Sequence, residues 1–292
     1  MRPIVRTCDI VNRIVVDDGS TDDTRITLKS WEGKLDGEIL FHPSNMGKGR
    51  AIRTALAAAK GQFTIIQDAD LEYWPEDYPR LLEPLLAGEA VVVYGSRYLR
   101  ESVTKRRFTV FRFGVSLLNV AVRVLYGVRL TDEATCYKVF PTEVLRAMDL
   151  ECERIEFCPE VTAKACRMGL RIAEVPVRYN ARTKKEGKKI RWRDGLTAIW
   201  TLWKWRNWQP PEAARRIVRE YKETQRVDAS AKIFEPHSSR CVGVAKEYGC
   251  SAEPDSKRTV DSRLRGNDGY CAGITDSARD SSTYPALLPA LN

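Results

Sequence analysis

Short apolar runs alternate with helical periodicity through the first part of this 292-residue chain. Each run ends in turn-forming or polar residues, as buried strands do, and the runs are 14–16, 39–41, 63–66 and 90–94. Between them, apolar residues recur at helical spacing in 49–60 and 79–86. Alternating strands and helices predict an α/β domain with a mainly parallel, Rossmann-like sheet and flanking helices.

The second part of the chain continues with three further helical segments and one strand. The predicted helices are 108–126, 155–168 and 196–208, and the predicted strand is 172–177. Residues 178–194 are strongly basic, and the last of these helices carries Trp200, Trp203, Trp205 and Trp208 beside Lys204 and Arg206. A short helix rich in Trp and cations suits a membrane interface. Packing of the same Trp residues on the folded domain is an equally good interpretation.

The composition changes after Pro210 and Pro211. Residues 1–209 are expected to form one folded domain, and residues 210–226 a polar helix or linker. In 227–292 the hydrophobic periodicity disappears and Ser, Arg, Asp and Gly dominate. This composition predicts a disordered tail.

The charge balance points to anionic partners. The 48 Lys and Arg residues exceed the 39 Asp and Glu residues by nine, which favours phosphates or an acidic membrane face. No nucleic-acid-binding motif is recognisable, so we do not expect nucleic acid as a partner. The eight Cys residues form no CxxC pair, which argues against a zinc site. We expect a cytoplasmic protein, with peripheral contact at the inner membrane face as a further option.

An acidic motif follows the apolar run 63–66. In an extended segment, residues i, i+2 and i+4 point to one face, so Asp68, Asp70 and Glu72 are expected to converge. Three carboxylates held together need a neutralising cation. Oxygen ligands suit Mg²⁺ or Mn²⁺, which also bridge diphosphate oxygens. The motif therefore predicts a divalent cation site, with a solvated acidic turn as the alternative.

Two further polar clusters follow predicted strands. Asp17 and Asp18 precede Gly19 and Ser20, and a carboxylate at a strand end can bind a ribose or base. Lys48 lies between two glycines, which allow the backbone to approach a ligand while the lysine meets a phosphate. Plain strand–turn–helix connections remain the alternative for both clusters.

Taken in order, these motifs resemble the family 2 glycosyltransferases. The matching segments are Val-Asp-Asp-Gly-Ser-Thr-Asp (16–22), Asn-x-Gly-Lys-Gly (45–49), Asp-Ala-Asp-Leu-Glu (68–72) and Gly-Ser-Arg (95–97). Within the family, the chain is similar to the dolichol-phosphate or polyprenyl-phosphate mannosyltransferase branch. The resemblance implies a GT-A-like fold and Mg²⁺ or Mn²⁺ as cofactor. It also implies transfer of mannose or glucose from GDP-mannose or UDP-glucose to a polyprenyl phosphate or a related cell-envelope acceptor, such as a growing glycan.

The resemblance also implies roles for individual residues. Asp17 and Asp18 match the acidic pair that recognises the nucleotide, and Lys48 lies in the phosphate-facing glycine segment. Asp68, Asp70 and Glu72 match the metal and sugar-diphosphate site. Basic residues that face the phosphates or close over the donor are matched by Arg97, Arg182, Lys188 and Lys189, of which Arg97 and Arg182 join Asp70 as the catalytic candidates. Asp132 and Glu160 match positions on the acceptor side.

The expected chemistry is a direct displacement with inversion at the anomeric carbon. A lipid monophosphate is already anionic near neutral pH, with a second pKa of about 6, so it needs positioning and charge screening more than a general base. The sequence departs from the family at its start, because residues 1–10 lack the expected first strand and its Asn-Glu pair. This departure predicts an N-terminally truncated catalytic domain. The alternative function is therefore a non-catalytic remnant of such an enzyme.

Overall fold

The computed structural model describes residues 12–99, 110–182 and 192–233. The strands are β1 (Arg13–Asp17), β2 (Gly37–Phe41), β3 (Phe63–Ile65), β4 (Val92–Ser96), β5 (Lys138–Pro141) and β6 (Ile172–Pro176). The helices are α1 (Thr24–Trp31), α2 (Lys48–Ala58), α3 (Tyr78–Leu86), α4 (Val110–Tyr126), α5 (Thr142–Ala147), α6 (Phe157–Arg167), α7 (Trp192–Lys204) and α8 (Glu212–Ile233).

The strands form two hydrogen-bonded groups. β1 and β2 pair in parallel, and a four-stranded sheet has the order β3-β5-β4-β6. In that sheet β4 and β6 are parallel, whereas β5 runs antiparallel to both β3 and β4. The predicted α/β class with parallel strands is therefore confirmed. The sequence pattern did not predict β5, which lies antiparallel between β3 and β4.

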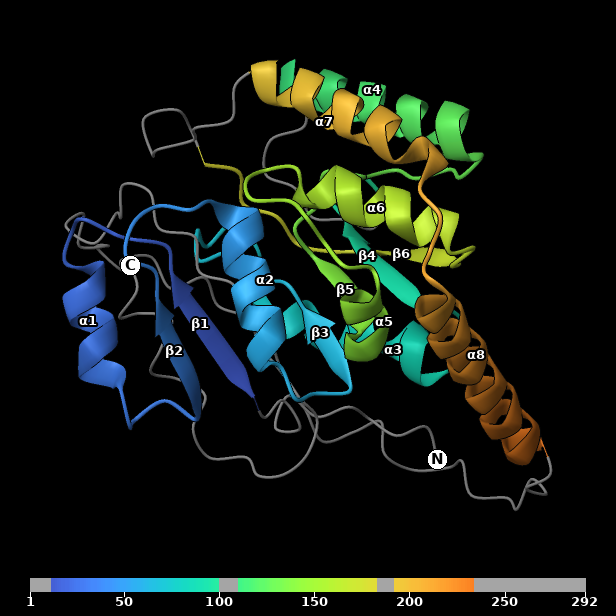
Figure 1. The fold of residues 1–292 in the computed structure, drawn as a ribbon, viewed down its shortest axis with the longest axis horizontal. Helices are drawn as coiled ribbons and strands as arrows, with labels where there is room; N and C mark the ends of the chain where they lie inside the picture. Colours follow the sequence, from blue (N-terminus) through green and yellow to red (C-terminus); the bar gives the residue numbers. More distant parts are fainter. Residues whose placement is uncertain (1–11, 100–109, 183–191, 234–292) are drawn as a thin grey trace, which may run out of the picture.

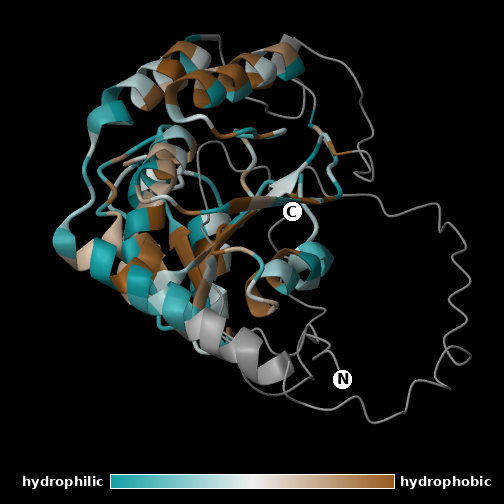
Figure 2. Cartoon of the chain, turned by 90° about the vertical axis from the view of Figure 1, so that its right-hand side faces the viewer, coloured by the Kyte–Doolittle hydropathy of each residue, from teal (hydrophilic) through white to brown (hydrophobic). Residues whose placement is uncertain are grey.

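One apolar core joins both groups of strands. Ile14 of β1, Ile52 of α2, Ile66, Tyr94 of β4 and Phe157 of α6 are all fully buried in it. A second cluster lies around α3 and includes Val93 and Val139. Figure 2 shows the hydrophobic strands inside this arrangement. Burial of these side chains supplies the main driving force that fixes the strand ends, and thus the loops that follow them.

The helices lie around the sheet in a consistent arrangement (Figure 1). α3 packs against β4 and β6, α2 packs against β1, and α6 contacts both α4 and α7. α4 and α7 lie side by side and are separated from the sheet by α6. Because α4 follows β4 and α7 follows β6 in the sequence, both outer helices are continuations of chain segments that leave the same sheet.

Two predictions concern the ends of the folded domain. The predicted polar helix begins at Glu212 and runs through Ile233, seven residues beyond the expected end at 226. The expected absence of a first strand concerns residues 1–10, which lie outside the described residues.

Candidate active site

The candidate site lies around the loops that follow β3 and β4. β3 ends at Ile65, and the chain continues through Gln67 into the acidic motif. The segments that meet it come from the start of α2, the loop before β5 and the residues after β6, all far apart in the sequence. The fold therefore brings the predicted acidic motif against basic and thiol groups from three other segments.

Asp68 forms the first ion pair of this site. Its Oδ2 lies 2.5 Å from Nζ of Lys48, the first residue of α2. The same oxygen accepts a hydrogen bond from the Cys136 thiol at 2.6 Å. Burial alone would lower the pKa of Lys48, but the charge of Asp68, together with Cys136, Cys158 and the hydrogen bond to Asp68, raises it well above its usual value. Lys48 is therefore a fixed positive charge.

The thiol beside this pair stays protonated. Burial, followed by the charge of Asp68, raises the pKa of Cys136 well above its ordinary value. A thiol that keeps its proton is a hydrogen-bond donor and a poor nucleophile. Cys136 therefore orients the Asp68 carboxylate, and covalent chemistry at its sulfur is not favoured.

The acidic motif is not extended throughout, because the chain turns at Leu71. Leu71 has a φ of 57°, which breaks the extended alternation on which the prediction of a shared face rests. Asp70 Oδ1 accepts the backbone N–H of Glu72 at 3.1 Å. Among the described residues, no group of three or more His, Cys, Asp and Glu side chains is arranged to hold a metal ion. Metal binding by Asp68, Asp70 and Glu72 stays a prediction.

Glu72 has another role, which is to hold the chain after β6. Its Oε2 accepts the Tyr179 hydroxyl at 2.6 Å, and its Oε1 accepts the backbone N–H of Arg182 at 2.8 Å. The backbone oxygen of Glu72 also accepts the N–H of Asn180. Glu72 therefore fixes residues 179–182 against the acidic motif.

Arg182 reaches the second carboxylate of the motif. Its Nη2 lies 2.9 Å from Oδ2 of Asp70, and its side chain is about a third exposed. Burial, and then the charges of Asp68 and Glu72, raise the pKa of Asp70 to about 6, although Arg182 opposes this rise. The negative charge around Asp70 is thus only partly balanced. Arg182 and Asp70, both predicted catalytic candidates, are brought together by the fold.

The Asp17 and Asp18 carboxylates are buried and hold the neighbouring loops. Asp17 accepts the N–H of Ser20 and pairs with Arg25 at 2.9 Å. Asp18 Oδ1 lies 2.7 Å from Nδ1 of His42. Its two oxygens also accept the backbone N–H groups of Met46 and Gly47.

These contacts give Asp17 and Asp18 a structural role beside their predicted contact with a nucleotide. Both aspartates make their described hydrogen bonds to protein groups, so their observed role is to shape the loop that leads into α2 and Lys48. Gly47 suits that loop, since its φ is 97° and a Cβ there would lie 2.4 Å from the Glu153 carbonyl oxygen. Contact of Asp17 or Asp18 with a nucleotide stays a prediction.

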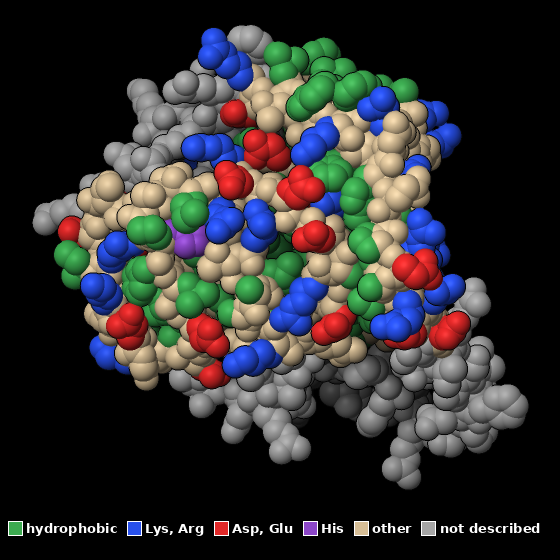
Figure 3. Space-filling view, in the orientation of Figure 1, with side chains coloured by type: hydrophobic (Ala, Val, Ile, Leu, Met, Phe, Trp, Pro, Cys, Tyr) green, Lys and Arg blue, Asp and Glu red, His purple; other side chains and the backbone are tan. Residues whose placement is uncertain are grey.

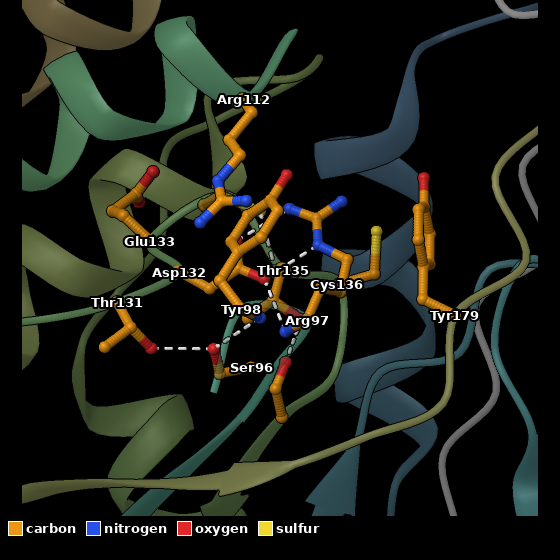
Figure 4. A network of polar contacts seen from close by, with 12 residues as sticks. Ser96, Arg97, Tyr98, Arg112, Thr131, Asp132, Glu133, Thr135, Cys136 and Tyr179 are labelled. Atoms are coloured by element: carbon orange, nitrogen blue, oxygen red, sulfur yellow. Dashed lines mark hydrogen bonds and ion pairs between the residues drawn. The ribbon is translucent and has the colours of Figure 1, made fainter. Parts of the chain in front are cut away.

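Arg97 is buried in an ion pair with Asp132 (Figure 4). Its Nε and Nη2 each donate to one Asp132 oxygen at 2.7 Å, and its backbone N–H donates to the same carboxylate. The guanidinium also lies over the Tyr179 ring at 5.0 Å and the Tyr98 ring at 5.5 Å. The pair joins the end of β4 to the loop before β5. Contact of Arg97 with phosphates and the place of Asp132 on the acceptor side stay predictions.

Glu160 is likewise a structural residue. Its carboxylate is buried, pairs with Lys164 at 2.7 Å and accepts the backbone N–H groups of Glu151 and Cys152. In the structure it supports the loop beside α2, and its place on the acceptor side stays a prediction. Lys188 and Lys189 lie outside the described residues.

Sequence reasoning missed several residues of the site. His42, Cys136 and Tyr179 each contact a predicted acidic residue. Cys136 belongs to a segment, 131–140, that follows no obvious motif spacing of its own, and a single Tyr or His gives no periodic signal. Only the tertiary structure reveals these contacts.

The arrangement of strands and helices is that of a GT-A-like glycosyltransferase. Residues 5–148 match the model of the Glycosyl transferase family 2. An uncharacterized protein of Methanocaldococcus jannaschii is 31% identical over 172 residues, covering 57% of this chain and 69% of the relative. The chain belongs to glycosyl transferase family 2.

Two further proteins are similar to this chain. A dolichyl-phosphate beta-glucosyltransferase of Trichomonas vaginalis is 32% identical over 187 residues, which are 61% of this chain and 56% of that protein. A crystal structure of glucosyl-3-phosphoglycerate synthase from Mycobacterium tuberculosis, in complex with phosphoglyceric acid, has a TM-score of 0.49 and 25% identity, covering 68% and 70% of the two chains. The chain spans about half the length of most of the curated relatives that it matches.

Proposed function

We propose that this chain transfers a hexose, mannose or glucose, from a nucleotide sugar to a polyprenyl phosphate at the inner face of a membrane. The observation that carries the proposal is the pairing of Asp68 with Lys48 and of Asp70 with Arg182 at one edge of the sheet. Such a cluster of both signs suits a ligand that carries a cation and a diphosphate together. Similarity to a dolichyl-phosphate glucosyltransferase supports the lipid phosphate as acceptor.

Donor binding is proposed to exchange these ion pairs. Arg and Lys bind phosphate oxygens as well as carboxylates, and Arg does so with two parallel hydrogen bonds. When Lys48 and Arg182 turn to the diphosphate, Asp68 and Asp70 are freed for a cation. Without a donor, Lys48 and Arg182 thus balance part of the negative charge of Asp68 and Asp70. In the donor complex the cation would take over this balance.

Asp68 and Asp70 are the residues that would hold Mg²⁺ or Mn²⁺. Burial, and then the charges of Asp68 and Glu72, raise the pKa of Asp70. A cation would offset the repulsion among these carboxylates, which favours its binding. Two carboxylates leave the remaining oxygen ligands to the diphosphate and to water, as is usual for Mg²⁺. A bound cation supplies charge stabilisation to the departing nucleoside diphosphate.

The residues of this chain are proposed to position an acceptor that is already a nucleophile. A phosphate monoester carries a second pKa of about 6, so at neutral pH it attacks without losing a proton to the enzyme. Its oxygen displaces the nucleoside diphosphate in line, the anomeric configuration inverts, and no covalent enzyme intermediate forms. Arg182 then stabilises the phosphate charges on both sides of the reacting carbon.

A transfer assay tests this proposal. The purified chain is incubated with Mn²⁺ or Mg²⁺, radiolabelled GDP-mannose or UDP-glucose, and a short polyprenyl phosphate in detergent. We expect labelled lipid of inverted configuration, which requires the cation. Asp70→Ala should abolish it, while Asp36→Ala, at an exposed acidic position, serves as the matched control.

Two results would overturn parts of the proposal. Absence of labelled lipid with every donor favours the non-catalytic alternative. A product that retains the donor configuration excludes direct displacement, whichever sugar is transferred.

A further inference from the structure

The outer faces of α4 and α7 carry most of the exposed large hydrophobic side chains of the described residues. On α4 these are Phe113, Leu117, Val120 and Val124, and on α7 they are Leu196, Trp200 and Trp203. Their spacing of three or four residues places each set on one face of its helix. The two sets together are called the α4–α7 face below.

The exposure of this face is large. Phe113 is 71% exposed, Val124 is 76% exposed and Trp200 is 58% exposed, whereas Val122 and Leu202, on the inner sides of the same helices, are fully buried. In Figure 3 hydrophobic side chains gather along the edge of the molecule formed by these helices. Contiguous apolar surface of this kind marks an interaction site.

The Trp residues of α7 divide between two roles. Trp205 is buried, and the ammonium of Lys164 lies over the Trp205 and Trp208 rings at 4.0 and 5.3 Å. Trp200 and Trp203 stack on each other on the outer side, with ring centroids 4.9 Å apart. Packing on the folded domain therefore holds for Trp205 and Trp208, whereas Trp200 and Trp203 stay exposed on the outer side.

The positive charge around the α4–α7 face favours an anionic partner. α4 and α7 carry the cations Arg112, Arg123, Arg193 and Lys204 against one acidic residue, Asp194. The guanidinium of Arg206 also lies over the Trp203 ring at 3.8 Å. Trp and aliphatic side chains flanked by Arg and Lys are typical of helices that lie in the interface of a bilayer containing anionic lipids.

The helices are too short to cross a bilayer. Among the described helices, none is long and apolar enough to span a membrane. α4 has 17 residues and α7 has 13, and their inner faces are occupied by α6 and by each other. They can therefore bury only their outer face, which fits a helix pair lying along the membrane surface.

The face is also connected to the candidate active site. Arg112, in the first turns of α4, lies over the Tyr98 ring at 5.2 Å, and Tyr98 follows Arg97. The ring of Tyr179 lies under Arg97, and its hydroxyl donates to Glu72 of the acidic motif. The start of α4 is therefore linked through Tyr98, Arg97 and Tyr179 to the candidate site.

We propose that the α4–α7 face docks on an anionic lipid bilayer, with Phe113, Val124, Trp200 and Trp203 entering the interface. The proposal deepens the proposed function, since it names the surface that brings the chain to a membrane-held acceptor. It rests on the exposed apolar spacing and the cationic border, and the acceptor itself is not required for docking.

Vesicle flotation tests the docking directly. The chain is mixed with vesicles of phosphatidylcholine alone or of phosphatidylcholine with phosphatidylglycerol, without donor or polyprenyl phosphate. We expect flotation with the anionic vesicles, and a fall of about tenfold or more in binding for the double variant Phe113→Asp/Trp200→Asp, because interfacial binding scales with buried apolar area. Ile26→Asp, at a residue of α1 that is 70% exposed, is the matched control and should bind normally.

A second measurement uses the unchanged chain, so it does not depend on the folding of a variant. Vesicles with brominated acyl chains should quench part of the Trp fluorescence, because Trp200 and Trp203 reach the acyl boundary. No flotation with anionic vesicles, equal binding of the double variant, or absence of quenching would each overturn the docking. A concentration-dependent dimer that the double variant abolishes, in chains that ignore vesicles, would assign the face to a second copy instead.

The two proposals fail separately. A chain that binds vesicles but transfers no sugar overturns the proposed function and leaves the docking intact. A chain that transfers sugar to a short polyprenyl phosphate in detergent yet ignores vesicles overturns the docking alone.

Discussion

Nη2 of Arg182 lies 2.9 Å from Oδ2 of Asp70, although the two residues are 112 positions apart in the sequence. The contact joins the segment after β6 to the acidic motif after β3. It also sets the protonation of the site, because the charge of Arg182 lowers a pKa that burial and neighbouring carboxylates raise.

Replacing this arginine is expected to change the pH dependence of activity. In Arg182→Ala the pKa of Asp70 rises above its value of about 6, and the acid limb of the pH–rate profile moves up by about one unit, the size of an Asp–Arg effect. The profile of kcat/KM for sugar transfer measures this. Arg178→Ala is the matched control, since Arg178 has similar exposure and pairs with Asp77. An unchanged acid limb in Arg182→Ala would show that Asp70 does not control activity.

Removal of carboxylates separates the metal site from its support. We expect Asp70→Asn to weaken Mn²⁺ binding in the presence of the nucleoside diphosphate by about tenfold or more, an effect at least as large as the loss of a supporting group. Glu72→Gln should leave Mn²⁺ affinity nearly unchanged, because Glu72 binds Tyr179 and Arg182 instead. Electron paramagnetic resonance of free Mn²⁺ follows the titration. Equal losses in both variants would restore the three-carboxylate site.

The buried pair of Arg97 and Asp132 is expected to support stability. Asp132→Ala leaves an uncompensated guanidinium in the interior, which costs about 3–5 kcal/mol of unfolding free energy. The double variant Arg97→Met/Asp132→Ala should recover part of this loss, since no charge remains buried. Urea unfolding of both variants provides the comparison. A double variant less stable than Asp132→Ala would indicate that Arg97 has a further essential partner.

The raised pKa of Asp70 predicts how the effect of its replacement on stability depends on pH. The folded-state pKa of about 6 lies above the ordinary value of 3.8, so the folded protein holds this proton more tightly than the unfolded chain does. The contribution of this proton to the free energy of unfolding is therefore complete below pH 3.8 and is lost as pH rises to about 6. Measured by thermal unfolding, the stability of Asp70→Asn relative to the unchanged chain should rise over this window and then level off. A constant difference across the window would contradict the raised pKa.

The strands were predictable where apolar runs end in turn residues. The runs 14–16, 39–41, 63–66, 90–94 and 172–177 each overlap an observed strand. The signal is continuous in β3 and β4 because every residue of these two strands is buried. β5 gives no such signal, since it begins with Lys138 and ends with Pro141. The fold makes burial of Lys138 possible by placing its Nζ 2.6 Å from the Glu133 carbonyl oxygen and 3.6 Å from the Tyr94 ring centre.

The site was predictable as a set of residues but not as a set of contacts. Spacing selected Asp68 and Asp70, and the family resemblance selected Arg182, which the fold does bring into one cluster. Spacing could not predict the turn before Glu72, because one left-handed residue, Leu71, interrupts the side-chain alternation. Neither spacing nor resemblance indicated the Arg97–Asp132 ion pair, since it depends on a loop 35 residues away.

The position of β5 between β3 and β4 has a consequence for how the protein is made. β3 and β4 leave the ribosome well before residues 138–141, yet in the finished sheet neither is hydrogen-bonded to the other. Their edges must therefore wait for a strand synthesised later, and such long-range pairing is slow to form. Because Cys136 and Asp132 arrive with the same segment, the nascent chain can acquire its Asp68 thiol contact and its Arg97 ion pair together, before β6 is added to the other edge of β4.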